Sequence, residues 1–299
     1  MDQRNVLITG ASSGFGKLMA ISLVEKGYKV WASMRDLEGK NRTKAEGLKG
    51  EIQNQSGTLE VMELDVTKMQ SVQKAIDHIR ATDGKLEVIV NNAGVGSMAL
   101  LEDFTEEMLK NLFETNVNGV FRVTKAALSM MKNQNDGLVI NISSGLGRVC
   151  LPTFTYYNAS KWALEALAQS WRYEFSPLGI DCVLVEPGAF PTTDFMDNMA
   201  VFSVDASSKA SEYGDLFNLH ANFKAMVEQQ INDGTANNPQ MVADAVVKLI
   251  ETPKGKRPFR TVVDPGFEQF LDPYNKMLDD IQQNLLNEFG IGSLIQPKM

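Results

Sequence analysis

Apolar residues in the first 186 positions follow two alternating patterns. Short continuous apolar runs predict buried strands, and segments with apolar positions three and four residues apart predict helices. The predicted strands span residues 6–9, 28–33, 59–64, 86–90, 138–142 and 180–185. The predicted helices span residues 17–26, 72–79, 105–131 and 157–175. Because this alternation is typical of doubly wound α/β folds, we predict a mostly parallel seven-stranded sheet with helices on both faces.

The periodicity fades between residues 187 and 238, where polar residues mix with aromatic residues and methionines. Long irregular segments of compact domains are usually functional, so we predict a loop or lid here. The later elements are predicted as a helix over 241–250, an edge strand over 261–263 and a helix over 267–289 that is broken near Pro273. No linker-like composition separates this end, which predicts a single domain over residues 1–299, with residues 264–299 as a C-terminal extension.

Composition and charge narrow the class of protein. Hydrophobic residues make up 43% of the 299 positions and charged residues 22%, which is ordinary for a globular protein. The net charge of −8 argues against nucleic acid or an anionic membrane as the main partner. No apolar run reaches membrane-spanning length, and the strand that begins at residue 6 leaves no room for a signal peptide.

The cysteines and histidines predict neither disulfides nor a metal site. Cys150 and Cys182 both lie in apolar stretches and are expected to be buried thiols in a reducing compartment. His78 and His220 have no metal-ligating neighbours in the pattern, so no metal is expected. A cytoplasmic location is the default expectation.

A glycine-rich turn, Thr9-Gly10-Ala11-Ser12-Ser13-Gly14-Phe15-Gly16, joins the first predicted strand to the first helix. Its glycine spacing differs from the usual dinucleotide fingerprint, and a plain tight turn explains the spacing equally well. However, glycines at a strand-to-helix junction allow backbone N–H groups to approach a pyrophosphate at the helix N-terminus. The position therefore favours a phosphate site made by Gly10, Ser12, Ser13, Gly14, Phe15 and Gly16.

The end of the second predicted strand indicates which dinucleotide is bound. An acidic residue there reads the ribose of NAD, whereas a basic residue accommodates the 2′-phosphate of NADP. Met34 stands at the acidic position and Arg35 follows it. We therefore expect Arg35 to pair with the 2′-phosphate and NADP(H) to be favoured over NAD(H). The alternative is an exposed Arg35, with Asp36 reading the ribose of NAD.

Tyr157 and Lys161 are four residues apart near the start of a predicted helix and so share one face. An ammonium near a phenol lowers the phenol pKa from its ordinary value of ~10 towards neutral pH. Such pairs also occur by chance, but Ser144 and the stretch Asn91-Asn92-Ala93-Gly94 end predicted strands at the same edge of the sheet. Because open α/β sheets bind ligands at the carboxyl ends of their strands, a ligand site is expected there.

In combination, these motifs resemble the classical short-chain dehydrogenase/reductase family, over residues 4 to about 192. The resemblance rests on Thr9 to Gly16, Asp65-Val66, Asn91 to Gly94, Asn116, Ser144, Tyr157 with Lys161, and Pro187-Gly188. It departs at Phe15, where the family often has isoleucine. The second strand's end and the run from Pro187 to Thr192 look like hydroxysteroid dehydrogenases and related carbonyl reductases.

The resemblance implies a Rossmann-type, NAD(P)-binding enzyme that transfers a hydride between nicotinamide and a ketone or secondary alcohol. It implies that Tyr157 exchanges a proton with the substrate oxygen, that Lys161 binds the nicotinamide ribose and lowers the tyrosine pKa, and that Ser144 orients the oxygen. Asn116 would hold a water that links Lys161 to solvent. Cofactor contacts are implied for Asp65 and Val66 at the adenine, for Asn92, Ala93 and Gly94 at the ribose and phosphate, and for Pro187, Gly188, Phe190 and Thr192 at the nicotinamide.

The aromatic residues and methionines of residues 187–238 predict a hydrophobic lid over an apolar substrate, steroid-like or long-chain. They explain equally well a segment that simply packs onto the domain. A non-catalytic redox sensor and an epimerase or dehydratase on the same scaffold are the alternative functions. The resemblance also makes a homo-oligomer possible, paired through residues 105–131 and 157–175.

Overall fold

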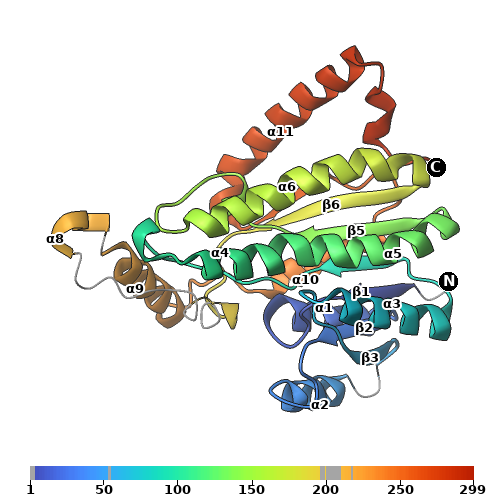
Figure 1. Ribbon diagram of the computed structural model, residues 1–299, viewed down its shortest axis with the longest axis horizontal. Helices are drawn as coiled ribbons and strands as arrows, with labels where there is room; N and C mark the ends of the chain where they lie inside the picture. The colour runs from blue at the N-terminus through green and yellow to red at the C-terminus, as the bar shows by residue number, and fades with distance from the viewer. Residues whose placement is uncertain (1–3, 53–54, 196–198, 200–209, 217) are drawn as a thin grey trace.

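The computed structural model describes residues 4–52, 55–195, 199, 210–216 and 218–299. Its strands are β1 (Asn5–Ile8), β2 (Lys29–Met34), β3 (Thr58–Glu63), β4 (Val88–Asn91), β5 (Gly137–Ile142), β6 (Ile180–Pro187) and β7 (Arg260–Val263). They form a seven-stranded sheet in the order β3-β2-β1-β4-β5-β6-β7, and every neighbouring pair is parallel (Figure 1). The predicted Rossmann-type fold is confirmed, and the sheet is wholly rather than mostly parallel.

Helices cover both faces of the sheet. One face packs against α1 (Gly14–Glu25), α2 (Arg42–Glu51) and α10 (Gln240–Glu251). The other packs against α3 (Met69–Asp83), α5 (Val120–Gln134) and α6 (Thr155–Phe175). The other α-helices within the described ranges are α4 (Glu106–Phe113), α8 (Ala210–Tyr213), α9 (Leu219–Asn232) and α11 (Pro265–Glu288).

The central strands β1, β4, β5 and β6 are largely apolar because both of their faces are buried. In β1, Val6 and Ile8 join the apolar cluster on the α1 side, and Leu7 joins the cluster on the α3 side. All three side chains are inaccessible to solvent. This two-sided burial explains why continuous apolar runs, rather than alternating ones, marked the strands in the sequence.

The strand order reverses between β1 and β4. From β1 the chain moves outward to β2 and β3, and it then returns to add β4 on the other side of β1. Such a reversal leaves a crevice at the carboxyl ends of the strands. The segments that follow β1, β4 and β5 therefore meet at one edge of the sheet.

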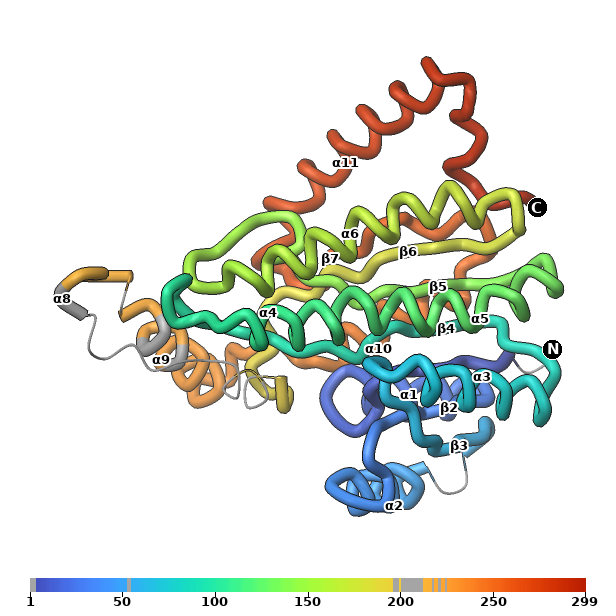
Figure 2. Tube along the Cα trace, viewed as in Figure 1, coloured from blue at the N-terminus to red at the C-terminus, as the bar shows by residue number. Residues whose placement is uncertain are grey.

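The C-terminal helix is continuous, so the predicted break near Pro273 is wrong. Pro273 lies on an exposed side of α11, where water can solvate the carbonyl that loses its partner. Leu271 and Asn275 on either side of it are buried and anchor the helix. Figure 2 shows α11 leading away from the sheet before the chain returns to the end of α6. There, Lys298 N donates to Ser176 O at 2.7 Å.

Two further expectations are modified. The segment 187–238 is not wholly irregular, because it contains α8 and α9. Part of this expected lid, residues 196–198, 200–209 and 217, lies outside the described residues.

Cys182 is buried as expected, but Cys150 is exposed because the turn that carries it lies at the surface. Among the described helices, none is both long enough and apolar enough to cross a bilayer.

Candidate active site

The glycine-rich turn is closely packed against the end of β4. Gly10 has φ +70° and Gly14 has φ +53°, values that favour glycine. A Cβ on Gly10 would lie 2.9 Å from Ala93 Cα, and a Cβ on Gly16 would overlap the carbonyl oxygen of Gly10. Ser13, the N-cap of α1, makes no side-chain capping bond. The first N–H groups of α1 are therefore available to an anionic ligand.

Thr9 and Asn92 hold the glycine turn and the end of β4 together. Thr9 Oγ1 donates to Val90 O and accepts hydrogen bonds from the N–H groups of Asn92 and Ala93, both at 3.0 Å. Asn92 Nδ2 donates to Thr9 O at 2.9 Å and to Gly10 O at 3.1 Å. Asn92 lines the cavity as expected, but its amide donor supports the turn. The sequence did not single out Thr9 for this role.

Basic residues gather beyond the end of β2. Arg35 is exposed and lines the cavity, together with Lys40 and Lys44, which sequence reasoning did not identify. Asp36, the alternative ribose reader, has φ +56°, and its Oδ2 accepts from Lys40 N at 3.0 Å. The Asp36 side chain thus closes its own turn and is not among the described residues that line the cavity.

Asp65 and Val66 line the same end of the cavity. Burial opposes ionisation of Asp65, but Thr67 donates to its Oδ1 from N at 3.0 Å and from Oγ1 at 2.7 Å. The net effect is a pKa below the ordinary value for Asp65. The carboxylate is therefore held by its own turn, at the position expected for the adenine.

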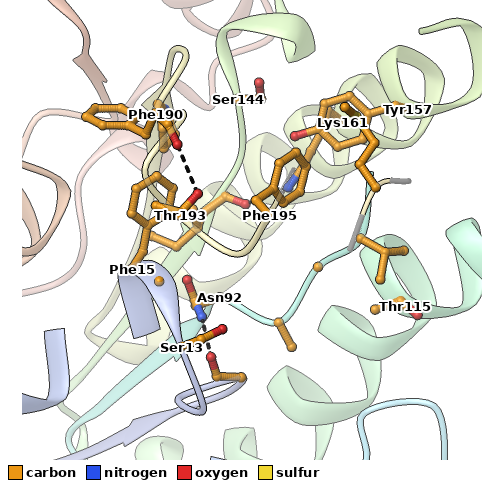
Figure 3. Close-up of a pocket in the computed structure, with 18 of the residues that line it drawn as sticks. Ser13, Phe15, Asn92, Thr115, Ser144, Tyr157, Lys161, Phe190, Thr193 and Phe195 are labelled. Carbon is orange, nitrogen blue, oxygen red and sulfur yellow. Dashed lines mark hydrogen bonds between the residues drawn. The ribbon is translucent and has the colours of Figure 1, made fainter. Parts of the chain in front are cut away.

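Ser144, Tyr157 and Lys161 meet at the other end of the cavity (Figure 3). Ser144 follows β5, and the other two side chains come from the first turns of α6. Ser144 Oγ accepts from Leu146 N at 3.1 Å and lies near the Tyr157 hydroxyl. Lys161 Nζ lies 5.7 Å from the centre of the Tyr157 ring and donates to Ile142 O at 2.9 Å. The predicted catalytic group is thus brought together.

Burial sets the proton affinities of this group. It raises the pKa of Tyr157 to about 12, although the nearby Ser144 hydroxyl acts in the opposite direction. It lowers the pKa of Lys161 to about 8, against the charge of Glu165. Desolvation of the phenolate is the largest cause, so the pKa of Tyr157 lies above its ordinary value here, and a lowering of that pKa by Lys161 stays a prediction. Tyr157 carries its proton at neutral pH and can donate it.

Asn116 lies in a π-helical segment, η2 (Glu114–Gly119), and is buried. Its Oδ1 accepts from Val95 N at 2.9 Å, and its Nδ2 donates to Val95 O at 2.9 Å and to Ser160 Oγ at 3.1 Å. These bonds fix the chain after β4 against α6. Asn116 is not among the described residues that line the cavity, so its side chain supports the site from behind.

The segment after β6 supplies a further wall of the cavity. Pro187, Gly188 and Phe190 line it, and Phe190 packs edge-to-face on Phe15 with ring centres 5.2 Å apart. Thr192, which was expected at the nicotinamide, is exposed, and the neighbouring Thr193 faces the cavity instead. Thr193 Oγ1 donates to Phe190 O at 3.0 Å (Figure 3). A tight turn at this position rotates one threonine outward and the next inward.

The cavity around Tyr157 is apolar. It has a volume of about 720 Å³ and continues from the glycine turn to Tyr157. Phe195 and Phe154 flank the Tyr157 ring at 5.8 Å and 6.4 Å between ring centres. The charged side chains in the described lining, apart from Lys161, all lie at the β2 and β3 end. The apolar lining includes Val95, Leu146, Leu151, Phe154, Phe195, Met199, Phe223, Met226, Val227 and Phe267.

These features fit a nicotinamide dinucleotide. The glycine turn leaves the N-terminus of α1 open to a pyrophosphate, since the N-cap Ser13 makes no side-chain capping bond. Basic side chains stand where the adenosine ribose is read, and the Ser144–Tyr157 hydroxyls stand at the opposite end. The arrangement can hold an anionic dinucleotide along the strand ends and a carbonyl compound beside Tyr157.

Comparison with known proteins supports this interpretation. A family model described as short chain dehydrogenase matches residues 4–200. The chain is 33% identical to 3-ketodihydrosphingosine reductase of Bacteroides thetaiotaomicron, with 89% of each chain covered. It is 32% identical to human 17-beta-hydroxysteroid dehydrogenase type 1, covering 92% of this chain and 81% of that protein. A solved short-chain dehydrogenase from Streptomyces avermitilis has 28% identity and a TM-score of 0.72, covering 98% and 99% of the two chains.

Proposed function

Because this chain belongs to the short chain dehydrogenase family, whose members are oxidoreductases that act on alcohol and carbonyl groups with a nicotinamide dinucleotide, we propose that it interconverts an apolar ketone and its secondary alcohol with NADP(H). The apolar cavity that ends at the hydroxyls of Ser144 and Tyr157 carries this proposal. In this assignment, the described part of residues 187–238 encloses the substrate and residues 264–299 extend the same domain.

The protein's own groups handle the proton, while the bound cofactor supplies or accepts the hydride. In reduction, Ser144 and Tyr157 hold the carbonyl oxygen, and Tyr157 donates its hydroxyl proton to it. The pKa of about 12 keeps that proton on Tyr157 until the oxygen gains charge. The Lys161 ammonium beside the ring stabilises the phenolate left behind, and Asn116 holds the chain around it.

An apolar substrate is supported by the lining around Tyr157 and by the two relatives named for a ketodihydrosphingosine and a hydroxysteroid. A matched pair of ketones tests it: a long-chain ketone and the same ketone ending in a carboxylate. Burying a carboxylate among apolar side chains is costly, so we expect kcat/KM with NADPH to be at least ~10-fold lower for the acid, about 1.4 kcal/mol. Equal kcat/KM values for the pair would refute the apolar assignment.

NADP(H) preference is supported by Arg35, Lys40 and Lys44 in the cavity lining and by the commitment of Asp36 to its own turn. We expect Arg35→Ala to raise the Kd for NADPH about 10-fold and to leave the Kd for NADH unchanged, because a charge-assisted bond to the 2′-phosphate is lost. Cofactor titrations measure both constants.

The matched control for this substitution is Arg42→Ala. Arg42 is exposed on the neighbouring α2, pairs with Glu46 at 3.3 Å and is outside the described cavity lining. Arg42→Ala should leave the Kd values for NADPH and NADH unchanged. If Arg35→Ala leaves the ratio of the two Kd values as it is in the wild type, Arg35 does not read the 2′-phosphate.

A further inference from the structure

A cluster of buried charged side chains lies next to the proposed catalytic group. Glu165 follows Lys161 by one turn on α6, and both are buried. A Cβ on Gly147 would lie 2.9 Å from Ser143 Oγ, 3.1 Å from Glu165 Cγ and 3.3 Å from Lys161 O. Glu165 therefore packs against the turn that follows Ser144. It is not among the described residues that line the cavity, so it would not touch cofactor or substrate.

Two arginines and a second glutamate surround Glu165. Arg260 of β7 donates from Nε to Glu165 Oε2 at 2.9 Å, and Arg148 Nη1 lies 4.0 Å from the same oxygen. Glu186 of β6 has its Oε1 3.5 Å from Arg260 Nε and 3.8 Å from Arg148 Nε. The four side chains are between 0% and 5% exposed. Their charges therefore act in an environment with little solvent screening.

The C-terminal helix completes the cluster. Asn275 of α11 accepts from Arg148 Nε at 2.8 Å and donates to Glu186 Oε2 at 2.7 Å. Asp279 of the same helix accepts from Arg260 Nη1 at 3.0 Å. The extension thus holds both arginines from the side opposite Glu165.

Buried ion pairs often stabilise a fold no better than apolar packing of the same volume. This cluster therefore needs a reason other than stability, and its position suggests one. Lys161 is buried, and its Nζ donates a hydrogen bond to an uncharged carbonyl, that of Ile142. Without a nearby negative charge, a buried ammonium loses its proton readily.

Charged and titratable groups face Lys161 from several elements: Tyr157 and Glu165 on α6, then Arg148, Glu186 and Arg260 behind Glu165. We propose that Glu165 is a positioning residue whose carboxylate, fixed by Arg260, keeps the Lys161 ammonium charged beside Tyr157. This inference rests on the proposed role of Lys161 in supporting the tyrosine.

The pKa directions agree with this geometry. Burial lowers the pKa of Lys161 to about 8, and the charge of Glu165 acts against that loss. Removing the negative charge of Glu165 must lower the titration midpoint of Lys161 further. Removing the positive charge of Arg148 must raise that midpoint. Glu186 requires a separate variant, because burial and the charge of Glu165 raise its pKa to about 8, in the same pH range. Opposite shifts from two neighbouring variants cannot arise from a general loss of packing.

Direct titration of Lys161 tests the proposal without cofactor or substrate. The full chain is labelled at lysine Cε with a carbon isotope visible to NMR, and the Lys161 signal is assigned with Lys161→Arg. Glu165→Gln should lower the midpoint by about one pH unit and Arg148→Gln should raise it by a similar amount. Glu174→Gln, at an exposed position on the same helix, should leave it unchanged. Glu186→Gln should shift it less than Glu165→Gln.

The alkaline limb of the kcat profile should move in the same directions, because activity falls as Lys161 loses its charge. An unchanged Lys161 midpoint in Glu165→Gln, or a larger shift in Glu186→Gln, overturns the proposal. If Glu165→Gln does not fold, Arg148→Gln decides, and a midpoint that fails to rise overturns it. A shifted midpoint in a chain that reduces no ketone would instead refute the proposed function and leave the Glu165–Lys161 coupling standing.

Discussion

Tyr157→Phe should lower kcat by about 10²–10⁴-fold, the range expected when a general acid is removed. The substitution deletes one hydroxyl and keeps the ring that packs against Phe154 and Phe195. Loss of one buried hydroxyl beside Ser144 should change the free energy of unfolding by only about 1 kcal/mol. Cofactor affinity should stay near the wild-type value. Steady-state kinetics, thermal unfolding and cofactor titration separate these three effects.

The adjacent tyrosine provides the control. Tyr156 packs against Phe104 with ring centres 4.5 Å apart, is partly exposed, and has no lysine four residues later. Tyr156→Phe removes the same atom one position away and should leave kcat unchanged. If Tyr157→Phe turns over at nearly the wild-type rate with cofactor bound, Tyr157 is not the proton donor.

Gly16→Ala should both destabilise the chain and weaken cofactor binding. Its Cβ would overlap Gly10 O and lie 2.6 Å from Asn92 Nδ2, so the glycine turn must shift. Such overpacking costs about 1–3 kcal/mol. We expect a lower Tm and a Kd for NADPH raised about 10-fold or more, because the turn carries the N–H groups that face the pyrophosphate.

Gly47→Ala is the matched comparison. Gly47 lies within α2, and no heavy atom lies within 4 Å of a Cβ placed there. Alanine in a helix is favoured over glycine by about 1 kcal/mol, so Gly47→Ala should raise Tm and leave the Kd unchanged. If Gly16→Ala binds NADPH as tightly as Gly47→Ala does, the proposed phosphate site is wrong.

Sequence patterns predicted the sheet because they report burial directly. Strands β1, β4, β5 and β6 are buried on both sides and therefore appear as continuous apolar runs. The Tyr157–Lys161 spacing was informative for a similar reason, since two residues one helical turn apart must share a face. The Pro273 break was mispredicted, because a local rule cannot show that buried neighbours anchor the helix on both sides of the proline.

The features of the site that could not be predicted from the sequence depend on contacts between segments that are far apart along the chain. Thr9 was not recognised because its partners, Asn92 and Ala93, are more than eighty residues away. The pKa of Tyr157 was expected to fall, since spacing shows the nearby ammonium but not the extent of burial. The buried cluster around Glu165 was invisible for the same reason, because charged residues in a sequence give no sign of being enclosed.

We propose that Tyr157 and Lys161 support the transfer of a hydride between nicotinamide and a carbonyl carbon in this cavity. It is tested most directly with NADPH that carries deuterium at the transferred position, mixed with an apolar ketone and followed by mass spectrometry of the alcohol. We expect one deuterium on the former carbonyl carbon, formed rapidly by the wild type and at least ~100-fold more slowly by Tyr157→Phe. An alcohol without the label, or equal rates in the two proteins, would contradict it.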